Sequence, residues 1–306
     1  MPNAANRPLA LLAGLTWRLG LYFAVLIGVV IALSKVAGPA LHRLGIGFSH
    51  PVGTPAAESV LVGETLILVG ASLATAIMLA FDREWRMAIL PARPTAARHF
   101  VQGLLWGFAG VGATLGAIAY LGGYHVLGLA LSGPALAYYA ALWAAAAFVN
   151  GLAENLAVLG YPLLRVAPAI GWRWAILLVA TFFAAGHLAN AGENPLGIAS
   201  VFMIGAVLAV AIYLTQDLWL SVGIHAGAVF AEDFTFSVPD SGVVYSGHLI
   251  VSRLDGPAWL SGGSAGPEGS VVAFPVFAVL LVLLCIVYRR RGALSEGTLK
   301  PLVQST

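Results

Sequence analysis

The chain alternates between long apolar runs and short polar connections along its whole length. Because a helix rises 1.5 Å per residue, about 20 apolar residues cross the ~30 Å hydrocarbon layer of a membrane. Backbone groups in lipid need hydrogen-bond partners within the protein, so runs of this length are expected to be helices. Eight such runs are present, at residues 18–38, 58–81, 101–121, 135–160, 173–190, 196–215, 217–233 and 271–288.

Composition agrees with this pattern. The 306 residues are 60% hydrophobic and only 9% charged, and the mean hydropathy is +0.91. In soluble domains about a quarter of the residues are charged, so a water-exposed surface could not be built from this chain. We therefore predict an all-α polytopic membrane protein with about eight transmembrane helices, in which residues 1–306 form a single transmembrane domain.

The positive charges predict the orientation of the helices, because Lys and Arg are retained on the cytoplasmic side. With eight crossings and an inside N-terminus, twelve of the fifteen Lys and Arg residues fall inside, and only Lys35, Arg43 and Arg253 fall outside. Both termini are therefore predicted to be cytoplasmic. The net charge is only +2, and basic residues are not interleaved with aromatic ones, so nucleic acid is not an expected partner.

Three ionisable residues lie deep in the apolar runs, where each costs at least ~2.5 kcal/mol. They are Glu154 in the fourth run, His187 in the fifth and His225 in the seventh. Counted from the inner edge of each run, helix rise places them ~16, ~21 and ~12 Å into the membrane. Glu58 and Glu64 lie near the start of the second run, and for them we expect structural roles. One carboxylate and two imidazoles at a shared depth are the candidate functional site.

Two kinds of site fit one glutamate with two histidines. A carboxylate base can hold and activate a water molecule while imidazoles stabilise the developing oxyanion, which is the division of roles that hydrolysis requires. The same set can bind zinc and leave a fourth position open for water. The H-E-x-x-H motif of zinc proteases is absent, so a metal would need ligands from three separate helices. Spacing along the chain does not decide between the two.

Three sequence motifs surround the candidate residues. They are A-E-N-L-A-V-L-G-Y at 153–161, F-A-A-G-H at 183–187 followed by L-A-N, and G-I-H-A at 223–226. In order and spacing they resemble the three motifs of the CAAX-protease and bacteriocin-processing family of intramembrane proteases. The first of these motifs is a pair of glutamates followed by Arg-Gly, and the second is F-x-x-x-H. The third is a histidine, which is usually followed by an asparagine four residues later. The resemblance covers roughly residues 150–275, including an outer loop rich in Gly, Ser and Pro.

This resemblance implies an intramembrane endopeptidase in which Glu154 activates water to hydrolyse a peptide bond. His187 and His225 would hold that water or stabilise the tetrahedral oxyanion. The residues expected to support these three are Asn155, Phe183, Asn190 and Asp233. The implied partners are a membrane-associated peptide or protein substrate and the lipid bilayer, and the implied location is a bacterial inner membrane. No cofactor is expected, with zinc as the alternative.

Three positions depart from the family pattern. Asn155 replaces the second glutamate, Leu159 replaces the arginine, and Val229 stands where the asparagine is expected. The first two are consistent with a paired change, because removing only one partner would leave a buried charge unpaired. The lost asparagine matters more, since one oxyanion-hole donor can be worth ~10²–10³ in rate. On α-helical spacing Glu232 and Asp233 share a face with His225 and could replace some of that polarity.

Other classes of protein stay open at this point. The departures fit a catalytically inactive relative that acts as a membrane scaffold or an immunity-type binding protein. A transporter also places ionisable residues in the membrane, but its usual internal repeats are not evident. The G-x-S-x-G pattern at 262–266 lies in a Gly-rich loop rather than on a strand-to-helix turn, so we interpret it as accidental.

Overall fold

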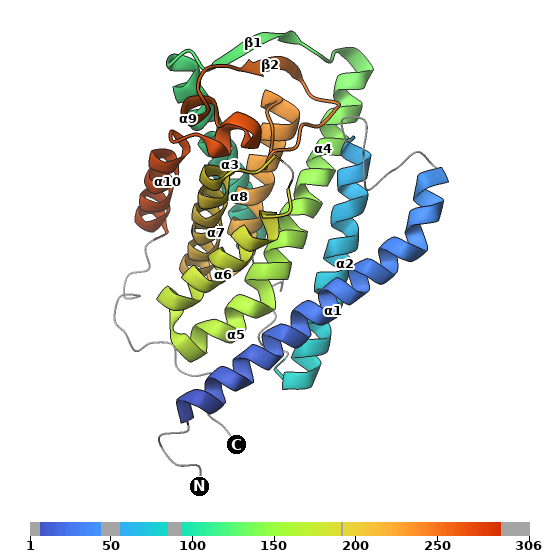
Figure 1. Ribbon diagram of the computed structural model, residues 1–306, viewed down its shortest axis with the longest axis vertical. Coiled ribbons are helices and arrows are strands. Elements are labelled where there is room, and N and C mark those ends of the chain that lie inside the picture. The colour runs from blue at the N-terminus through green and yellow to red at the C-terminus, as the bar shows by residue number, and fades with distance from the viewer. Residues whose placement is uncertain (1–6, 44–55, 85–93, 191, 289–306) are drawn as a thin grey trace.

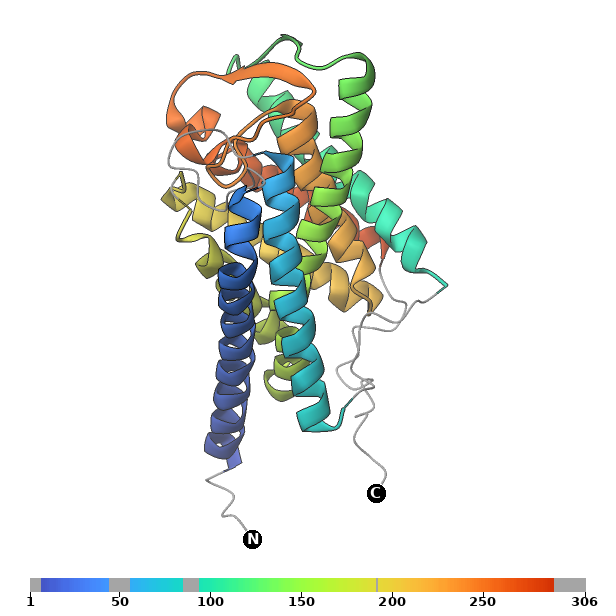
Figure 2. The ribbon, with the colours of Figure 1, turned by 90° about the vertical axis from the view of Figure 1, so that its right-hand side faces the viewer.

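The computed structural model describes residues 7–43, 56–84, 94–190 and 192–288, which form a helical bundle with a small irregular cap at one end (Figures 1 and 2). Each of the eight predicted apolar runs lies on a helix, in the predicted order, and the all-α class is confirmed. The helices that carry them are α1 (Arg7–Arg43), α2 (Ala57–Asp82), α3 (Ala96–Tyr120), α4 (Gly133–Glu154), α6 (Trp172–His187), α7 (Pro195–Thr215), α8 (Trp219–Val229) and α10 (Ala273–Val287).

Among the described residues, five helical segments are long and apolar enough to cross a membrane: Leu12–Leu41 within α1, the helices α2, α3 and α7, and the continuous stretch Gly133–Ile170 that begins with α4. The chain is a multi-pass membrane protein. The helices α6, α8 and α10 are shorter, with 16, 11 and 15 residues. They match the predicted runs at 173–190, 217–233 and 271–288, so the apolar pattern located these helices even where they are short.

Two π-helices interrupt the regular helical pattern. The first, η3 (Asn155–Gly160), follows α4 directly and leads into α5 (Tyr161–Ile170), so the helix continues ten residues beyond the predicted end of the fourth run. The second, η4 (Phe230–Phe236), extends α8. A π-helix adds a residue to the turn and rotates the side chains that follow, and such segments often mark functional sites.

The cap contains a two-stranded sheet that the hydropathy pattern did not predict. Strand β1 (Tyr124–Leu129) pairs antiparallel with β2 (Ile250–Leu254), and both lie above the helices in Figure 1. Short turns of helix, α9 (Ala258–Ser261), η5 (Gly263–Ala265) and η6 (Pro267–Gly269), complete the cap. The two strands come from the loops after the third and seventh predicted runs, so those loops lie at the same end of the bundle.

Glycines allow α8 to approach its neighbours closely. Gly103 and Gly107 on α3 face the backbone of α8, and Gly223 and Gly227 on α8 face the backbone of α3, so a methyl group at any of them would collide with main-chain atoms. Such small-xxx-small contacts are typical of packed membrane helices. On α4, Gly151 meets the α8 backbone in the same way. These contacts fix α8 against α4 at the level of the candidate site.

A polar cluster ties α1 to the rest of the bundle. Asp82, at the end of α2, accepts hydrogen bonds from Arg18 Nε at 2.9 Å and from the Tyr161 hydroxyl at 2.7 Å. The Asp82 side chain is only 2% exposed, so the charge of its partner arginine is needed to offset its burial. Figure 2 shows α1 and α2 side by side.

Candidate active site

The three ionisable residues predicted from the sequence meet in the structure. Glu154 is the last residue of α4, His187 is the last of α6, and His225 lies in the middle of α8. Oε2 of Glu154 lies 3.9 Å from Nε2 of His187 and 3.8 Å from Nε2 of His225. These separations exceed a direct hydrogen bond but suit a bridging water. The side chains are between 13% and 23% exposed, so the group is enclosed without being sealed.

Each imidazole is held by its other nitrogen. Nδ1 of His187 lies 2.9 Å from the carbonyl oxygen of Phe183, and Nδ1 of His225 lies 3.2 Å from Oδ1 of Asn155. Both oxygens only accept, so each Nδ1 carries the hydrogen and donates it. In the neutral form, each Nε2 then presents a lone pair toward Glu154.

Asn155 has a well-defined orientation, because its amide has two partners. Its Nδ2 donates to the Ser221 hydroxyl at 3.1 Å, which leaves Oδ1 to accept from His225. The side chain is fully buried. The predicted supporting residue Asn155 therefore contacts a candidate catalytic histidine directly.

Phe183, a residue of α6, packs against both histidines. Its ring centroid lies 5.1 Å from that of His187 and 5.7 Å from that of His225. The ring is buried, so it supplies an apolar wall that restricts the orientation of both imidazoles.

Two further polar residues lie behind Glu154. Asn150, one helical turn earlier on α4, donates from Nδ2 to Oε1 of Glu154 at 3.3 Å. The same amide hydrogen-bonds to Glu64, whose charge also acts on Glu154. Glu64, for which a structural role was expected, thus borders the site. Nothing in the sequence motifs pointed to Asn150.

The cap contributes acidic residues that sequence reasoning missed. Asp240 interacts electrostatically with Glu154, His225 and His187, and burial followed by the charge of Glu154 raises the pKa of Asp240. Burial also raises the pKa of Glu193, in the connection between α6 and α7. Asp240 belongs to the stretch S-V-P-D-S-G at 237–242, in the loop rich in Gly, Ser and Pro, and its distance along the chain gave no sign that the loop folds back onto the site.

A comparison with known families matches this region. Residues 135–231 match the family model described as Type II CAAX prenyl endopeptidase Rce1-like. The resemblance to CAAX proteases is confirmed. The match includes Glu154, His187 and His225 and ends before the outer loop. A comparison with curated proteins finds none that matches the chain.

Two of the three positions that depart from the CAAX-protease motifs, Leu159 and Val229, are buried in apolar surroundings. Leu159 lies in the main apolar core with no exposure, where an unpaired arginine would be costly. Val229 packs against Ala147 and Ala226 between α4 and α8 and is 4% exposed. Neither position supplies a polar group to the site.

The other two predicted supporting residues lie at its margin. Asn190 forms a turn after α6, in which its backbone N–H donates to the carbonyl oxygen of His187 at 3.0 Å. Asp233 is buried in η4. The charged groups that act on His225 are Glu154, Asp240 and His187, and Asp233 is not among them. Besides Glu154, the acidic neighbour of that histidine is therefore Asp240.

The geometry also tests the fit of a zinc ion to the three central residues. Among the described side chains, one group of three or more potential ligands has all its ligand atoms within 4.8 Å of one another, and Glu154 and the histidines are not in it. The three residues are thus not preassembled as a ligand group in the described part of the chain, and zinc stays the alternative to a metal-free site.

Proposed function

We propose that the protein is an intramembrane endopeptidase of the CAAX-protease type, which hydrolyses a peptide bond of a membrane-associated peptide or protein. The observation that supports it best is that both imidazoles turn Nε2 toward one carboxylate oxygen while Nδ1 of each is held. The match of residues 135–231 to a protease family agrees with it.

In the proposed reaction, Glu154 acts as the general base. A water molecule between Glu154 and the histidines gives a proton to the carboxylate while its oxygen attacks the carbonyl carbon of the substrate. The C–N bond then breaks, and the proton passes from Glu154 to the leaving nitrogen. No metal takes part in these steps.

The histidines are proposed to stabilise the oxyanion. A neutral imidazole with its hydrogen on Nδ1 accepts at Nε2 and can orient the water. A histidine that takes a proton from solvent before the substrate binds carries hydrogens on both nitrogens throughout the reaction, and it donates from Nε2 to the reacting carbonyl, where preorganised donors have their largest effect. Asn150 supplies a further amide beside Glu154, on the α4 side of the site.

An apolar groove is the proposed route for a membrane-bound substrate. It lies between α1, α5 and α6 and has a volume of about 610 Å³. Its walls include Gly20 and Phe23 on α1 and Phe182, Ala185 and Gly186 on α6. Gly186 directly precedes His187, so a hydrophobic chain in the groove would end beside the proposed catalytic group.

The test uses the full-length protein in nanodiscs with membrane-anchored peptides, with and without a prenylated C-terminal cysteine. Glu154→Gln should lower kcat by about 10²–10⁴ at an unchanged unfolding temperature. Glu58→Gln, at the start of α2, is the matched control and should retain activity. Equal cleavage by wild type and Glu154→Gln would exclude the general base. If the wild type cleaves nothing, the scaffold alternative is favoured.

Metal content checks the mechanism independently. The purified active protein is expected to contain far less than one equivalent of zinc, and chelators should leave the rate unchanged. A stoichiometric zinc ion that is lost in His187→Ala would contradict the glutamate mechanism.

We also propose that the membrane is a bacterial inner membrane and that both termini are cytoplasmic. The distribution of Lys and Arg supports this orientation. Alkaline phosphatase fused after Ser132 should be active, and the same enzyme fused after Gly171 should be inactive. The opposite result would invert the topology.

A further inference from the structure

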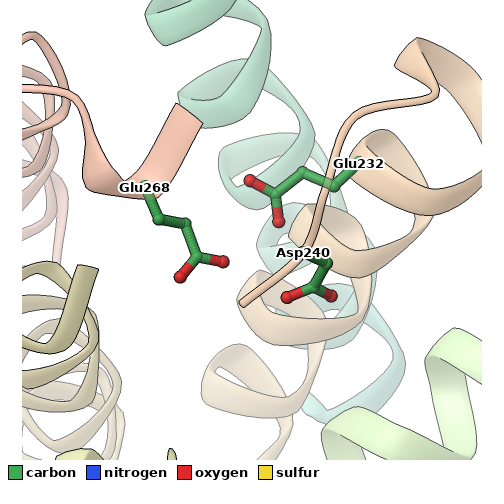
Figure 3. A group of neighbouring side chains, drawn as sticks. All are labelled: Glu232, Asp240 and Glu268. Carbon is green, nitrogen blue, oxygen red and sulfur yellow. The ribbon is translucent and has the colours of Figure 1, made fainter. Parts of the chain in front are cut away.

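Three carboxylates converge in the cap, beside the proposed active site but outside the catalytic group. They come from Glu232 on η4, Asp240 in the loop that follows and Glu268 on η6 (Figure 3). One oxygen of each lies within 4.8 Å of the others. The three residues are separated by up to 36 positions in the sequence, so the fold of the cap brings them together.

Among the three carboxylates, Glu232 is the one whose negative charge no neighbouring group compensates. Its side chain points at Asp240 and Glu268 (Figure 3), and the residue is only 6% exposed. Within the described part of the chain no hydrogen bond to its carboxylate is found. The charged groups that act on it are Glu268, Asp240 and Asp233, all of the same sign. A carboxylate that is buried in this way is costly unless a cation or a proton compensates it.

The neighbours of the other two carboxylates supply little positive charge. Asp240 and Glu268 hydrogen-bond to each other, which requires a proton between them whenever no cation is bound. Glu268 accepts a hydrogen bond from the Ser241 hydroxyl at 3.3 Å, which carries no charge. The basic groups that act on Asp240 are His225 and His187, whose Nδ1 hydrogens are already donated elsewhere. Asp233 adds a further buried carboxylate oxygen, Oδ1, without a partner among the described residues.

We infer that Glu232, Asp240 and Glu268 bind one Ca²⁺ ion. The donor set consists of oxygens alone, which hard cations prefer over zinc or copper. At a Ca²⁺–oxygen distance of ~2.4 Å, two ligands can lie up to ~4.8 Å apart, so oxygens of all three carboxylates can reach one such ion. Mg²⁺ demands near-ideal octahedral geometry and usually keeps several waters, so a site made mainly of protein carboxylates favours Ca²⁺.

Such an ion would link three segments of the cap to the bundle. It would join the end of α8, through η4, to the turn at Asp240 and to η6, which packs against α7 and α10. Asp240 also acts on the catalytic group, so the ion would hold the cap in place over the proposed site.

The experiment measures Ca²⁺ binding by the full-length protein in nanodiscs of zwitterionic lipid, after removal of divalent ions, with empty nanodiscs as the blank. The wild type should bind about one Ca²⁺ with a Kd of about 10⁻⁵–10⁻³ M, and its unfolding temperature should rise with Ca²⁺ more than with equal Mg²⁺. Glu268→Gln should weaken binding at least ~10-fold, since loss of even a second-shell partner costs that much.

Asp255→Asn is the matched control, because Asp255 is a cap carboxylate that pairs with Arg253 at 2.6 Å outside the cluster. It should bind Ca²⁺ like the wild type. If Glu268→Gln fails to fold, Glu232→Gln replaces it, and the wild-type isotherm is decisive by itself. Absence of binding by the wild type at millimolar Ca²⁺ overturns the inference, as does unaltered affinity in the folded cluster variants. These readouts do not involve proteolysis, so they stand or fall separately from the proposed function.

Discussion

Oδ1 of Asn155 accepts a hydrogen bond from Nδ1 of His225 at 3.2 Å and thereby sets the direction in which the imidazole faces. The amide is itself held by the Ser221 hydroxyl and is fully buried. In CAAX proteases a second glutamate is the usual residue at this position. In this protein a neutral amide fixes the histidine, and the neighbouring position of the usual arginine is the apolar Leu159.

The first prediction concerns this positioning residue. Asn155→Leu removes the acceptor, so His225 loses its preferred tautomer and orientation, and kcat should fall by about 10- to 100-fold with little change in KM. Asn155→Asp keeps an acceptor but adds a negative charge beside the imidazole. Because that charge favours the protonated imidazole, the pH profile of kcat should move to higher pH.

The control is Ser221→Ala, which removes the second partner of the amide and should have a smaller effect on kcat. The rates are measured with the same membrane-anchored peptides, and unfolding temperatures show whether each variant folds. A pH profile that is identical in Asn155→Asp and the wild type would mean that Asn155 has only a structural role.

The membrane helices and the central group of the site could be predicted because both follow from free-energy costs that the local sequence determines. An apolar run long enough to cross a bilayer must be helical, and an ionisable residue within it needs a reason to be there. Glu154, His187 and His225 were identified on this basis, and the structure brings them together.

The cap could not be predicted in the same way, because its contacts are long-range. Asp240 reaches the site only because its loop folds back, where Gly242 meets Gly192 backbone to backbone at a positive φ of 81°. The strands β1 and β2 pair across more than 100 residues of sequence. The π-helix η4, which carries Glu232 and Asp233, likewise does not follow from the α-helical period of the sequence.

The second prediction concerns the position where CAAX proteases usually have an asparagine. Val229 is 4% exposed and contacts Ala147 and Ala226, so Val229→Asn would bury an amide without partners. We expect it to destabilise the protein by about 1–3 kcal/mol, seen as a lower unfolding temperature, without any gain in kcat. A faster enzyme would show that the family's donor position is still functional in this fold.

Asn150 provides the matching test, since its amide contacts Glu154 directly. Asn150→Leu should lower kcat more than Val229→Ala does, because it removes the hydrogen bond to Oε1 of Glu154. Equal effects of the two substitutions would argue against a role for Asn150.

The third prediction tests the groove between α1 and α6. No atom lies within 4 Å of a Cβ placed on Gly186 or Gly20, so larger side chains fit there without strain. Gly186→Leu should fill the groove beside His187 and reduce cleavage of lipid-anchored peptides by at least ~10-fold, mainly through KM. Cleavage of a short peptide without an anchor should change little.

Gly28→Leu is the control, because Gly28 lies on α1 in equally open space but does not line the groove. It should cleave both kinds of peptide like the wild type. If Gly186→Leu slows both kinds equally, the substitution has disturbed His187 rather than blocked a path for the substrate.

The fourth prediction concerns stability at different pH values in the absence of divalent ions. Burial, followed by the charge of Glu154, raises the pKa of Asp240, and burial, followed by the charge of Asp240, raises the pKa of Glu268. In the unfolded chain both groups titrate near pH 4. The folded state therefore binds more protons, and its stability should fall as the pH rises from about 4 through the raised pKa values.

The variant Glu268→Gln isolates this contribution, because glutamine resembles the protonated acid and removes the repulsion on Asp240. In EDTA its unfolding temperature should exceed that of the wild type at pH 8, and the difference should shrink toward pH 5. Each unit of raised pKa corresponds to about 1.4 kcal/mol of stability. Asp255→Asn should follow the wild type at all pH values. A wild type and a Glu268→Gln variant that lose stability in parallel would mean that the cap carboxylates titrate normally in the folded protein.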